Sequence, residues 1–227
     1  MSYILTPPTI KWSDMLTKGY NMSSAIYAHF TMPNQRYQKV SDLLSHPLMR
    51  SDLGQEVGSL SYIERSPYRF IRTKALQEHT FLLTLTDETA LPILPSDFVQ
   101  MDLKKGDLLI SKDSNIGEIV ILDRDYPNHM LSGAIYKLPV KPEWRYYLLA
   151  MIKHNVFREQ LDALVPKGAT IRHAKTMFLD CKIPLPCSCE EETVKYISVL
   201  TQAIIDKETL IRKRHTDILH IIDDEIK

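Results

Sequence analysis

Residues 190–226 read EEETVKYISVLTQAIIDKETLIRKRHTDILHIIDDEI, a stretch that contains neither proline nor glycine. Three glutamates open it, and negative charge is favourable at the positive end of a helix dipole. Isoleucine recurs every seven residues, at Ile197, Ile204, Ile211 and Ile218. This spacing predicts one long helix that carries a coiled-coil seam.

The predicted helix is too long to bury its apolar stripe against a domain of this size, since it would span roughly 55 Å at about 1.5 Å per residue. We therefore expect it to pair with a second helix. Lys207, Glu208, Arg214 and His215 interrupt the stripe and favour a loose middle or a particular register. The alternative is a surface helix that folds back on its own domain. The expected dimerisation residues are Val194, Ile197, Leu200, Ile204, Ile211, Ile218 and Ile222.

A short linker precedes this helix. Pro184 and Pro186 stiffen the chain and forbid continued helix, so we place a boundary between unit 1–186 and unit 187–227. Three cysteines, Cys181, Cys187 and Cys189, are too few and too clustered for a disulfide framework. With His173 they could supply four zinc ligands, but the spacing fits no established finger, and we expect neither metal nor cofactor.

Between residues 62 and 136 the pattern is that of strands and turns. Alternating or apolar runs predict strands at 68–72, 81–85, 108–111 and 118–122. The polar loop 112–117 joins the last two strands. The sequence therefore predicts an α+β fold in which a β-rich domain with flanking helices is followed by a long C-terminal helix.

Helical and strand signals also flank this region. Spacing over residues 143–161 predicts one helix, and residues 178–183 predict a further strand. A helix start at Ser41 and Asp42 would end quickly at Pro47, and the first stretch, to about Phe30, is expected to dock on the domain. Trp12 and Trp144 are expected to be core anchors.

Composition is that of an ordinary globular protein, with 44% hydrophobic and 25% charged residues among 227. No apolar run approaches the roughly 20 residues of a membrane-spanning helix. The N-terminus lacks the layout of a signal peptide, so we expect a cytoplasmic location. The net charge is zero, but residues 1–189 carry 22 basic and 19 acidic side chains. That bias is weak support for a nucleic-acid partner.

Several segments, in order, resemble the specificity subunits of type I restriction-modification systems. These segments are YRFIRTK at 68–74, LKKGDLLISK at 103–112, SNIG at 114–117, KGAT at 167–170 and KIPLP at 182–186. The long helix follows the last of them. No single segment is specific; their order and spacing carry the likeness. The sequence departs from the family at 187–192, where CSCEEE stands in place of a typical Glu-Gln pair, and the first 60 residues match poorly.

The resemblance implies a half-length subunit without catalytic activity. Unit 1–186 would be a target-recognition domain that binds double-stranded DNA, and unit 187–227 a dimerisation and spacer helix. Two copies would pair antiparallel as a homodimer and read a bipartite target. The implied partners are methyltransferase (M) subunits and a restriction (R) subunit.

Three polar segments are the candidate DNA-contacting surfaces. Arginine can donate two hydrogen bonds to guanine, Asn115 could pair with adenine, and Asp113 could accept from cytosine, whereas lysines favour phosphates. For each residue the alternative is a solvated surface charge or an intrachain ion pair. The candidates are Arg65, Tyr68, Arg69, Arg72 and Lys74, then Lys112, Asp113, Ser114 and Asn115, then Lys167, Thr170, Arg172, His173 and Lys175.

Rival functions find less support in the sequence. No glycine-rich cofactor loop or Asn-Pro-Pro-Tyr tetrapeptide indicates a methyltransferase, and Asp97, Asp102 and Lys104 only loosely imitate a nuclease carboxylate set. A different class remains open, a coiled-coil protein-interaction module without DNA binding. It agrees slightly better with the zero net charge. Salt-sensitive DNA binding would separate the two.

Overall fold

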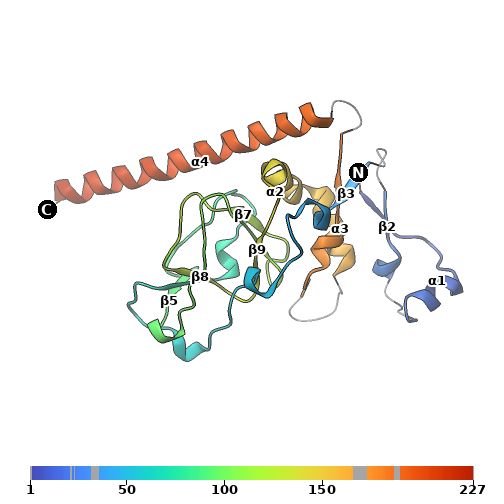
Figure 1. Cartoon of the computed structure of the whole chain (residues 1–227), viewed down its shortest axis with the longest axis horizontal. Coiled ribbons are helices and arrows are strands. Elements are labelled where there is room, and N and C mark those ends of the chain that lie inside the picture. The colour runs from blue at the N-terminus through green and yellow to red at the C-terminus, as the bar shows by residue number, and fades with distance from the viewer. Residues whose placement is uncertain are drawn as a thin grey trace.

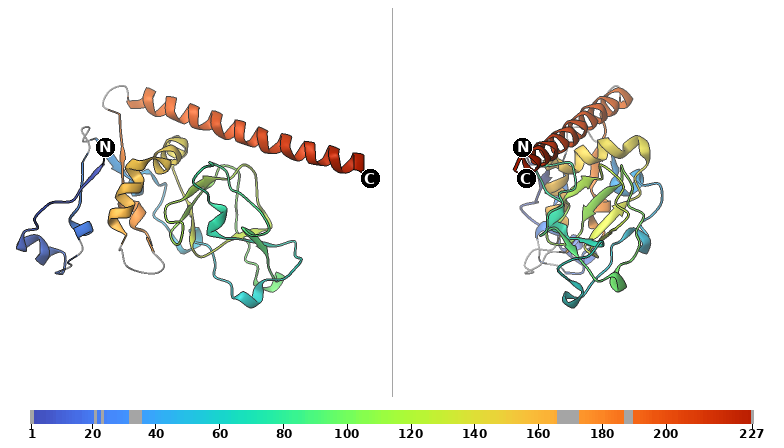
Figure 2. Two further views of the ribbon diagram at one scale, coloured as in Figure 1. Left: turned by 180° about the vertical axis from the view of Figure 1, so that it is seen from behind. Right: turned by 90° about the vertical axis from the view of Figure 1, so that its left-hand side faces the viewer.

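The long C-terminal helix α4 (Glu190–Ile226) runs along one side of a β-rich body (Figure 1). The computed structural model describes residues 2–20, 22, 24–31, 36–165, 173–186 and 190–226. A small N-terminal lobe stands at the end of the body where α4 begins, and the C-terminal end of α4 extends past the body on the other side (Figures 1 and 2). The predicted fold class, α+β with a long C-terminal helix, is confirmed.

Two three-stranded sheets form the body, with strand orders β5-β4-β8 and β7-β6-β9. Strands β4 and β8 pair in parallel, and the other pairs are antiparallel. The strands are β4 (Arg69–Ile71), β5 (Ala90–Pro92), β6 (Leu108–Ser111), β7 (Ile119–Ile121), β8 (His129–Leu131) and β9 (Ile135–Leu138).

Two antiparallel strand pairs lie outside these sheets. In the N-terminal lobe β1 (Ile4–Leu5) pairs with β2 (His29–Phe30), and the short helix α1 (Trp12–Thr17) lies between the two strands in the chain. Strand β3 (Tyr37–Lys39), where the chain enters the body, pairs with β10 (Lys182–Pro184), where the chain leaves it toward α4. Eight short 3-10 helices complete the described chain: η1 (Ser24–Tyr27), η2 (Val40–Leu43), η3 (Arg50–Asp52), η4 (Ser59–Ser61), η5 (Thr73–Ala75), η6 (Pro95–Asp97), η7 (Pro142–Trp144) and η8 (Met177–Asp180).

The sheet β7-β6-β9 separates two hydrophobic clusters. In β6, Leu108 and Ile110 face the cluster that contains helices α2 (Arg145–Lys153) and α3 (Asn155–Leu164). Leu109, which lies between them, faces the cluster around β4 and β8. Successive side chains of a strand point to opposite faces, so the uninterrupted apolar run LLI at the start of β6 fits a strand buried on both sides.

The predicted helix over 143–161 is instead two helices, α2 and α3. His154 interrupts them with extended backbone, at φ −87° and ψ 150°. Its side chain accepts a hydrogen bond from the Val156 backbone N–H at 3.1 Å and so caps α3. Spacing alone could not show this break, because both helices turn apolar faces to the same cluster.

Three further expectations were wrong in part. Residues 81–85 form no strand, and only an isolated bridge joins Leu82 to Ile121. Within 178–183 the first half of the segment belongs to the 3-10 helix η8, and strand β10 begins only at Lys182. Trp12 is 66% exposed in the N-terminal lobe, whereas Trp144 packs against the first cluster as expected for a core anchor.

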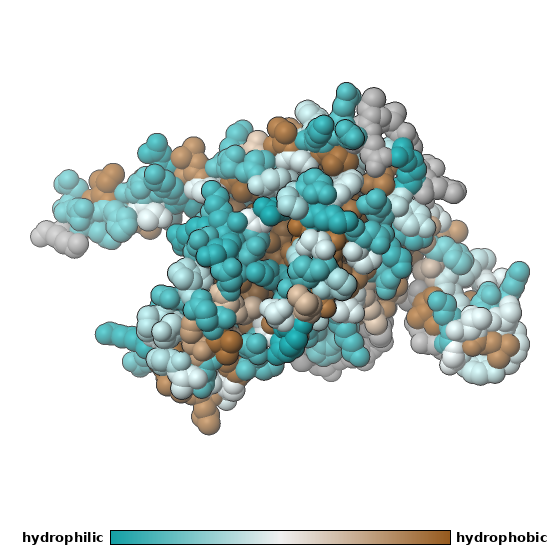
Figure 3. All heavy atoms as spheres, in the orientation of Figure 1, coloured by the Kyte–Doolittle hydropathy of each residue, from teal (hydrophilic) through white to brown (hydrophobic). Residues whose placement is uncertain are grey.

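Helix α4 is docked on its own domain from Val194 to Arg212. Val194 and Ile205 are buried and Ile197 packs beside them, mainly against α2. A seven-residue repeat drifts by about 20° per repeat on a straight helix, so the early members of the stripe turn toward the domain. Along the predicted stripe, the exposed residues therefore begin at Leu200. The distal apolar residues stay exposed, as Figure 3 shows along the free end of α4.

No helix in the described part of the chain is both long and apolar enough to cross a membrane.

A buried ion cluster ties the helices to the hairpin β6–β7. Glu118 directly precedes β7, and its carboxylate pairs with Lys153 of α2 at 3.5 Å and with Arg158 of α3. Lys153 also donates to the backbone carbonyls of Gln77, at 2.6 Å, and Glu78, at 3.1 Å. Burial lowers the Lys153 pKa, and the charge of Glu118 opposes that shift. Glu118 thereby compensates two cations that the fold takes out of water.

Replacing Glu118 with Gln should lower the free energy of unfolding by about 3 kcal/mol, because Lys153 and Arg158 would keep their burial without a counter-charge. Urea denaturation at neutral pH measures the change. The matched control is Glu143→Gln at an exposed position, where the loss should stay within about 0.5 kcal/mol. Equal stabilities of the two variants would contradict the assigned role.

Candidate nucleic-acid interface

The first predicted segment lies on and around β4. Tyr68 does not stand free as a stacking platform, because its ring stacks on Phe98 with centroids 4.2 Å apart. Arg69 donates to the Ala90 carbonyl at 3.4 Å and lies 3.9 Å from the Asp87 carboxylate. The side chains of the other three members of this segment, Arg65, Arg72 and Lys74, are exposed.

His129 is the neighbour of Arg69 across the parallel pair β4–β8. Burial, together with the charges of Arg124 and Arg69, lowers the His129 pKa to about 4. Its Nδ1 has no hydrogen-bond partner among the described residues. At neutral pH the imidazole is uncharged, so it adds no positive charge beside Arg69.

The second and third predicted segments meet in the fold. Asp113 in the loop after β6 pairs with Lys112 at 2.7 Å and with His173 Nδ1 at 2.6 Å. The Ala174 backbone N–H also donates to the Lys112 carbonyl at 2.8 Å. We name the three side chains Lys112, Asp113 and His173 the loop latch. Because the Asp113 carboxylate is engaged within the chain, this arrangement favours the intrachain alternative for Asp113 over a cytosine acceptor.

The loop 112–117 has a fixed shape beyond the latch. Ser114 adopts φ +62° and Gly117 φ +76°, in the left-handed region. A Cβ at Gly117 would lie 2.5 Å from Leu161 Cδ2, so glycine is required there both by its φ and by the contact with α3. Arg158 donates to the Ile116 carbonyl at 2.8 Å. Helix α3 thus supports the loop from behind and leaves Asn115 exposed at its tip.

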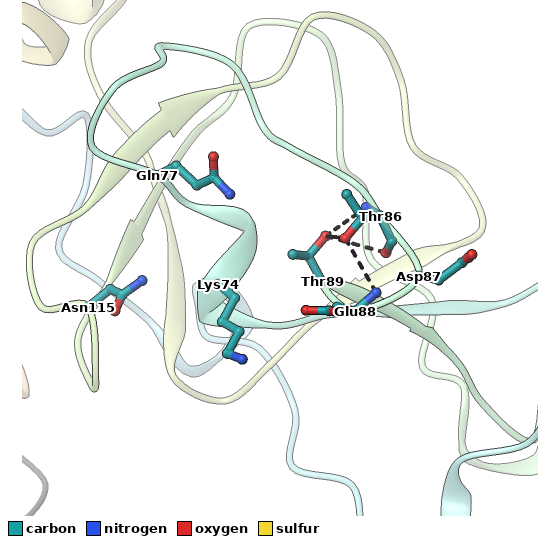
Figure 4. Close-up of a pocket in the computed structure, with 7 residues that line it drawn as sticks. All are labelled: Lys74, Gln77, Thr86, Asp87, Glu88, Thr89 and Asn115. Carbon is teal, nitrogen blue, oxygen red and sulfur yellow. Dashed lines mark hydrogen bonds between the residues drawn. The ribbon is translucent and has the colours of Figure 1, made fainter.

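A pocket of about 680 Å³ brings the first and second segments together. Its lining comes from η5, from the following chain, from the turn 86–89 and from the tip of the loop 112–117 (Figure 4). The lining residues are Lys74, Gln77, Thr86, Asp87, Glu88, Thr89 and Asn115.

The wall of the pocket opposite Asn115 is a rigid turn. Thr89 Oγ1 donates to the Thr84 carbonyl at 2.8 Å and accepts from the Thr86 backbone N–H at 2.8 Å. The Glu88 backbone N–H donates to Thr86 Oγ1 at 3.3 Å. Such side-chain bonds to nearby backbone groups hold a turn without a neighbouring strand.

The polar groups of this pocket fit base edges better than phosphate. Lys74 is the one cationic side chain in the lining, against the carboxylates of Asp87 and Glu88. Two carboxylates repel a phosphate group, but they can accept hydrogen bonds from the exocyclic amino groups of bases. The amides of Gln77 and Asn115 can pair with an adenine edge. The exposed arginines outside the pocket remain suited to the DNA backbone.

Sequence reasoning missed Gln77 and the turn 86–89, and it did not place Lys74 and Asn115 in one pocket. Repeated threonines and acids in TDET (86–89) are a turn signal that could have been used. Gln77 carries no such signal. Lys175 is exposed, at φ +47°, and it does not line the pocket. Lys167, Thr170 and Arg172 lie outside the described residues.

The zinc alternative depends on cysteines that are only partly described. Cys181 is fully buried, and burial, with a smaller effect from Asp180, raises the pKa of its thiol to about 12. Cys187 and Cys189 lie outside the described residues. Within the described part of the chain, no three His, Cys, Asp or Glu side chains are placed to hold a metal ion.

No protein-family model matches the chain. No curated protein matches it in sequence. Among solved structures, it is similar to the HsdS subunit from Thermoanaerobacter tengcongensis, with 16% identity, a TM-score of 0.46 and coverage of 82% of this chain and 41% of that one. It is also similar to the Type-I restriction-modification system S subunit from M. genitalium, with 12% identity, a TM-score of 0.48 and coverage of 82% and 45%.

A third similar chain comes from a structural study of complex assembly and conformational transition of the type I R-M system. It has 14% identity and a TM-score of 0.45, and the match covers 85% of this chain and 45% of that one. The present chain thus spans less than half the length of each of these structures.

Replacing Asp113 with Asn should loosen the loop latch and cost about 1 kcal/mol of stability, since one charge of a partly buried network is lost. We expect faster hydrogen exchange of the backbone amides in 112–117, with little change in the sheets. Asp102→Asn is the matched control, because Asp102 pairs with Lys104 at 3.2 Å on the open surface. Unchanged exchange in the Asp113 variant would show that the latch does not hold the loop.

Proposed function

We propose that this chain is the sequence-specific DNA-recognition subunit of a type I restriction-modification enzyme. In this role it directs partner methyltransferase and restriction subunits to a bipartite target. It performs no catalysis itself, and it acts in the cytoplasm. The observation that carries the proposal is the pocket in which Lys74 and Asn115, from two separately predicted segments, converge on a rigid scaffold. The order of the sequence segments described above supports it as well.

The pocket divides the two tasks of a DNA reader. Amide and carboxylate groups inside it can distinguish base edges, while Arg65 and Arg72 are exposed outside it and can neutralise phosphates. Loops placed on a rigid scaffold are the usual carriers of such contacts. Helices α2 and α3 supply that rigidity through Glu118, Lys153 and Arg158.

Lys74→Ala should weaken DNA binding about equally for all sequences and reduce the slope of log K against log salt by about 1. Asn115→Ala should instead relax the preference at one base position, by about 1–3 kcal/mol. Methylated-motif mapping in cells that express the chain with its methyltransferase, and salt titration of DNA binding, measure the two effects.

Lys104→Ala is the control for the lysine, because Lys104 is an exposed lysine at the other end of β6. Asn128→Ala is the control for the amide, since Asn128 is exposed and outside the pocket. Absence of any salt-sensitive DNA binding, even beside the methyltransferase, would overturn the proposal.

The working unit in this proposal is an antiparallel homodimer formed through α4. The side chains of Leu200, Ile204, Ile211, Ile218 and Ile222 are between 44% and 67% exposed and follow one side of the helix. The antiparallel arrangement is the one that the resemblance described above implies, and it would set the two domains at opposite ends of the paired helices. Two recognition domains would then face inverted half-sites.

Replacing Ile204 and Ile211 together with Glu should convert the dimer to a monomer, because two charges would be buried in the seam without partners. Light scattering at micromolar concentration measures the mass, and circular dichroism checks that the domain stays folded. Lys213→Glu, an exposed position outside the seam, should remain dimeric. A monomeric wild-type chain, or a double variant that still dimerises, would contradict the assignment.

One observation favours a second candidate, a protein-interaction module that uses α4 alone. The distal half of α4 exposes a run of large apolar side chains, from Leu210 to Ile226, and the pocket holds more acidic than basic groups. This candidate requires no DNA affinity. The salt titration described above therefore separates the two functions.

A further inference from the structure

Helix α4 contacts the domain through charged side chains as well as through its apolar residues. Glu208, in the middle of the helix, accepts a hydrogen bond from Thr80 Oγ1 at 2.7 Å and one from the Phe81 backbone N–H at 3.2 Å. These partners belong to the chain that connects Gln77 to the turn 86–89, and both ends of that chain line the pocket.

One helical turn further, Arg212 reaches the same chain. Its guanidinium donates to the Leu83 carbonyl at 2.6 Å, to Thr80 Oγ1 at 3.2 Å and to Thr84 Oγ1 at 3.3 Å. Hydrogen bonds to charged groups are among the stronger ones in proteins. They also explain why residues 81–85 form no strand, since part of their backbone is bonded to side chains of α4.

The contact continues without a gap into the pocket. The Thr84 carbonyl accepts from Thr89 Oγ1, which also holds the Thr86 backbone N–H. At the other end of this chain, Lys153 fixes the Gln77 carbonyl. The pocket wall is therefore clamped by α2 at Gln77 and by α4 at Thr80–Thr84.

The two faces of α4 have different roles at this level. Thr201, Ile205, Glu208 and Arg212 follow one line, spaced three to four residues apart, and they are buried or half-buried against the domain. Ile204 and Ile211 are exposed on an adjacent line. Both rows of side chains project from the same helical backbone, so a displacement of one row also displaces the other.

We propose that Glu208 and Arg212 are positioning residues for the DNA-reading pocket, so that α4 fixes the geometry of the pocket wall as well as the spacing of two domains. This inference rests on the proposed function and deepens it. Neither residue touches DNA in this arrangement; both act through the segment 80–89. A shift of α4 would move the wall that faces Asn115.

The test compares Arg212→Ala with Arg214→Ala in the full chain. Arg214 lies on the same helix, is largely exposed and pairs with Asp217 at 3.8 Å, so it controls for the loss of one arginine. Hydrogen exchange followed by mass spectrometry reports on the segment 80–89. Selection from a pool of DNA duplexes with randomised bases reports on sequence preference, alone and with the methyltransferase present.

We expect Arg212→Ala to accelerate exchange in 80–89 and to reduce the selectivity at some motif positions by about tenfold, while affinity for unrelated DNA stays unchanged. Arg212→Lys should restore part of the selectivity, and Arg214→Ala should behave like the wild type. If Arg212→Ala does not fold, Thr84→Val removes one of the same contacts with almost the same side-chain shape and should show the same change in smaller measure.

If Arg212→Ala shows the same hydrogen exchange and selects the same DNA motif as the wild type, the inference is overturned. An equal loss of affinity for all DNA would also overturn it, because that result indicates a direct phosphate contact or general instability. A wild-type chain that selects no motif would overturn the proposed function instead, and accelerated exchange in the same variant would then reduce Arg212 to a structural residue.

Discussion

The carboxylate of Glu118 holds together parts of the molecule that are far apart in sequence. It neutralises Lys153 of α2 and Arg158 of α3 in a partly buried position, where an uncompensated charge is costly. Lys153 extends the cluster to the chain around Gln77, and Arg158 extends it to the loop after β6. The two sides of the pocket are therefore set by one electrostatic cluster, and the positions of Gln77 and Asn115 depend on it.

Helix α4 adds a second set of charged contacts to the same pocket wall. Glu208 and Arg212 satisfy backbone groups of 80–84 that no strand satisfies. Buried backbone groups need partners, and here a helix supplies them with its side chains. The helix thus joins the β-rich body by hydrogen bonds and by apolar packing, and its outer and distal apolar residues stay exposed.

Several features of the site could be predicted from the sequence because their signals are local. The run LLIS and the following polar loop define the hairpin that carries Asn115, and RFIR defines β4 beside Lys74. The meeting of these two segments in one pocket could not be predicted, since it depends on contacts between residues about 40 positions apart. Gln77 gave no signal, because its role comes from where Lys153 holds its backbone. The engagement of Asp113 with His173 likewise joins residues 60 positions apart.

The sequence by itself determined the long helix, the buried hairpin and the α+β class, because heptad spacing, the absence of proline and glycine, and continuous apolar runs act over short distances. Only the tertiary structure decided which part of the α4 stripe stays exposed. Ile197 belongs to the same repeat as Ile211 and Ile218, and Val194 lies one turn before it, yet both pack on the domain. The reason is that a repeat fixes a stripe on a helix, while the surface beside that helix decides which part of the stripe is covered.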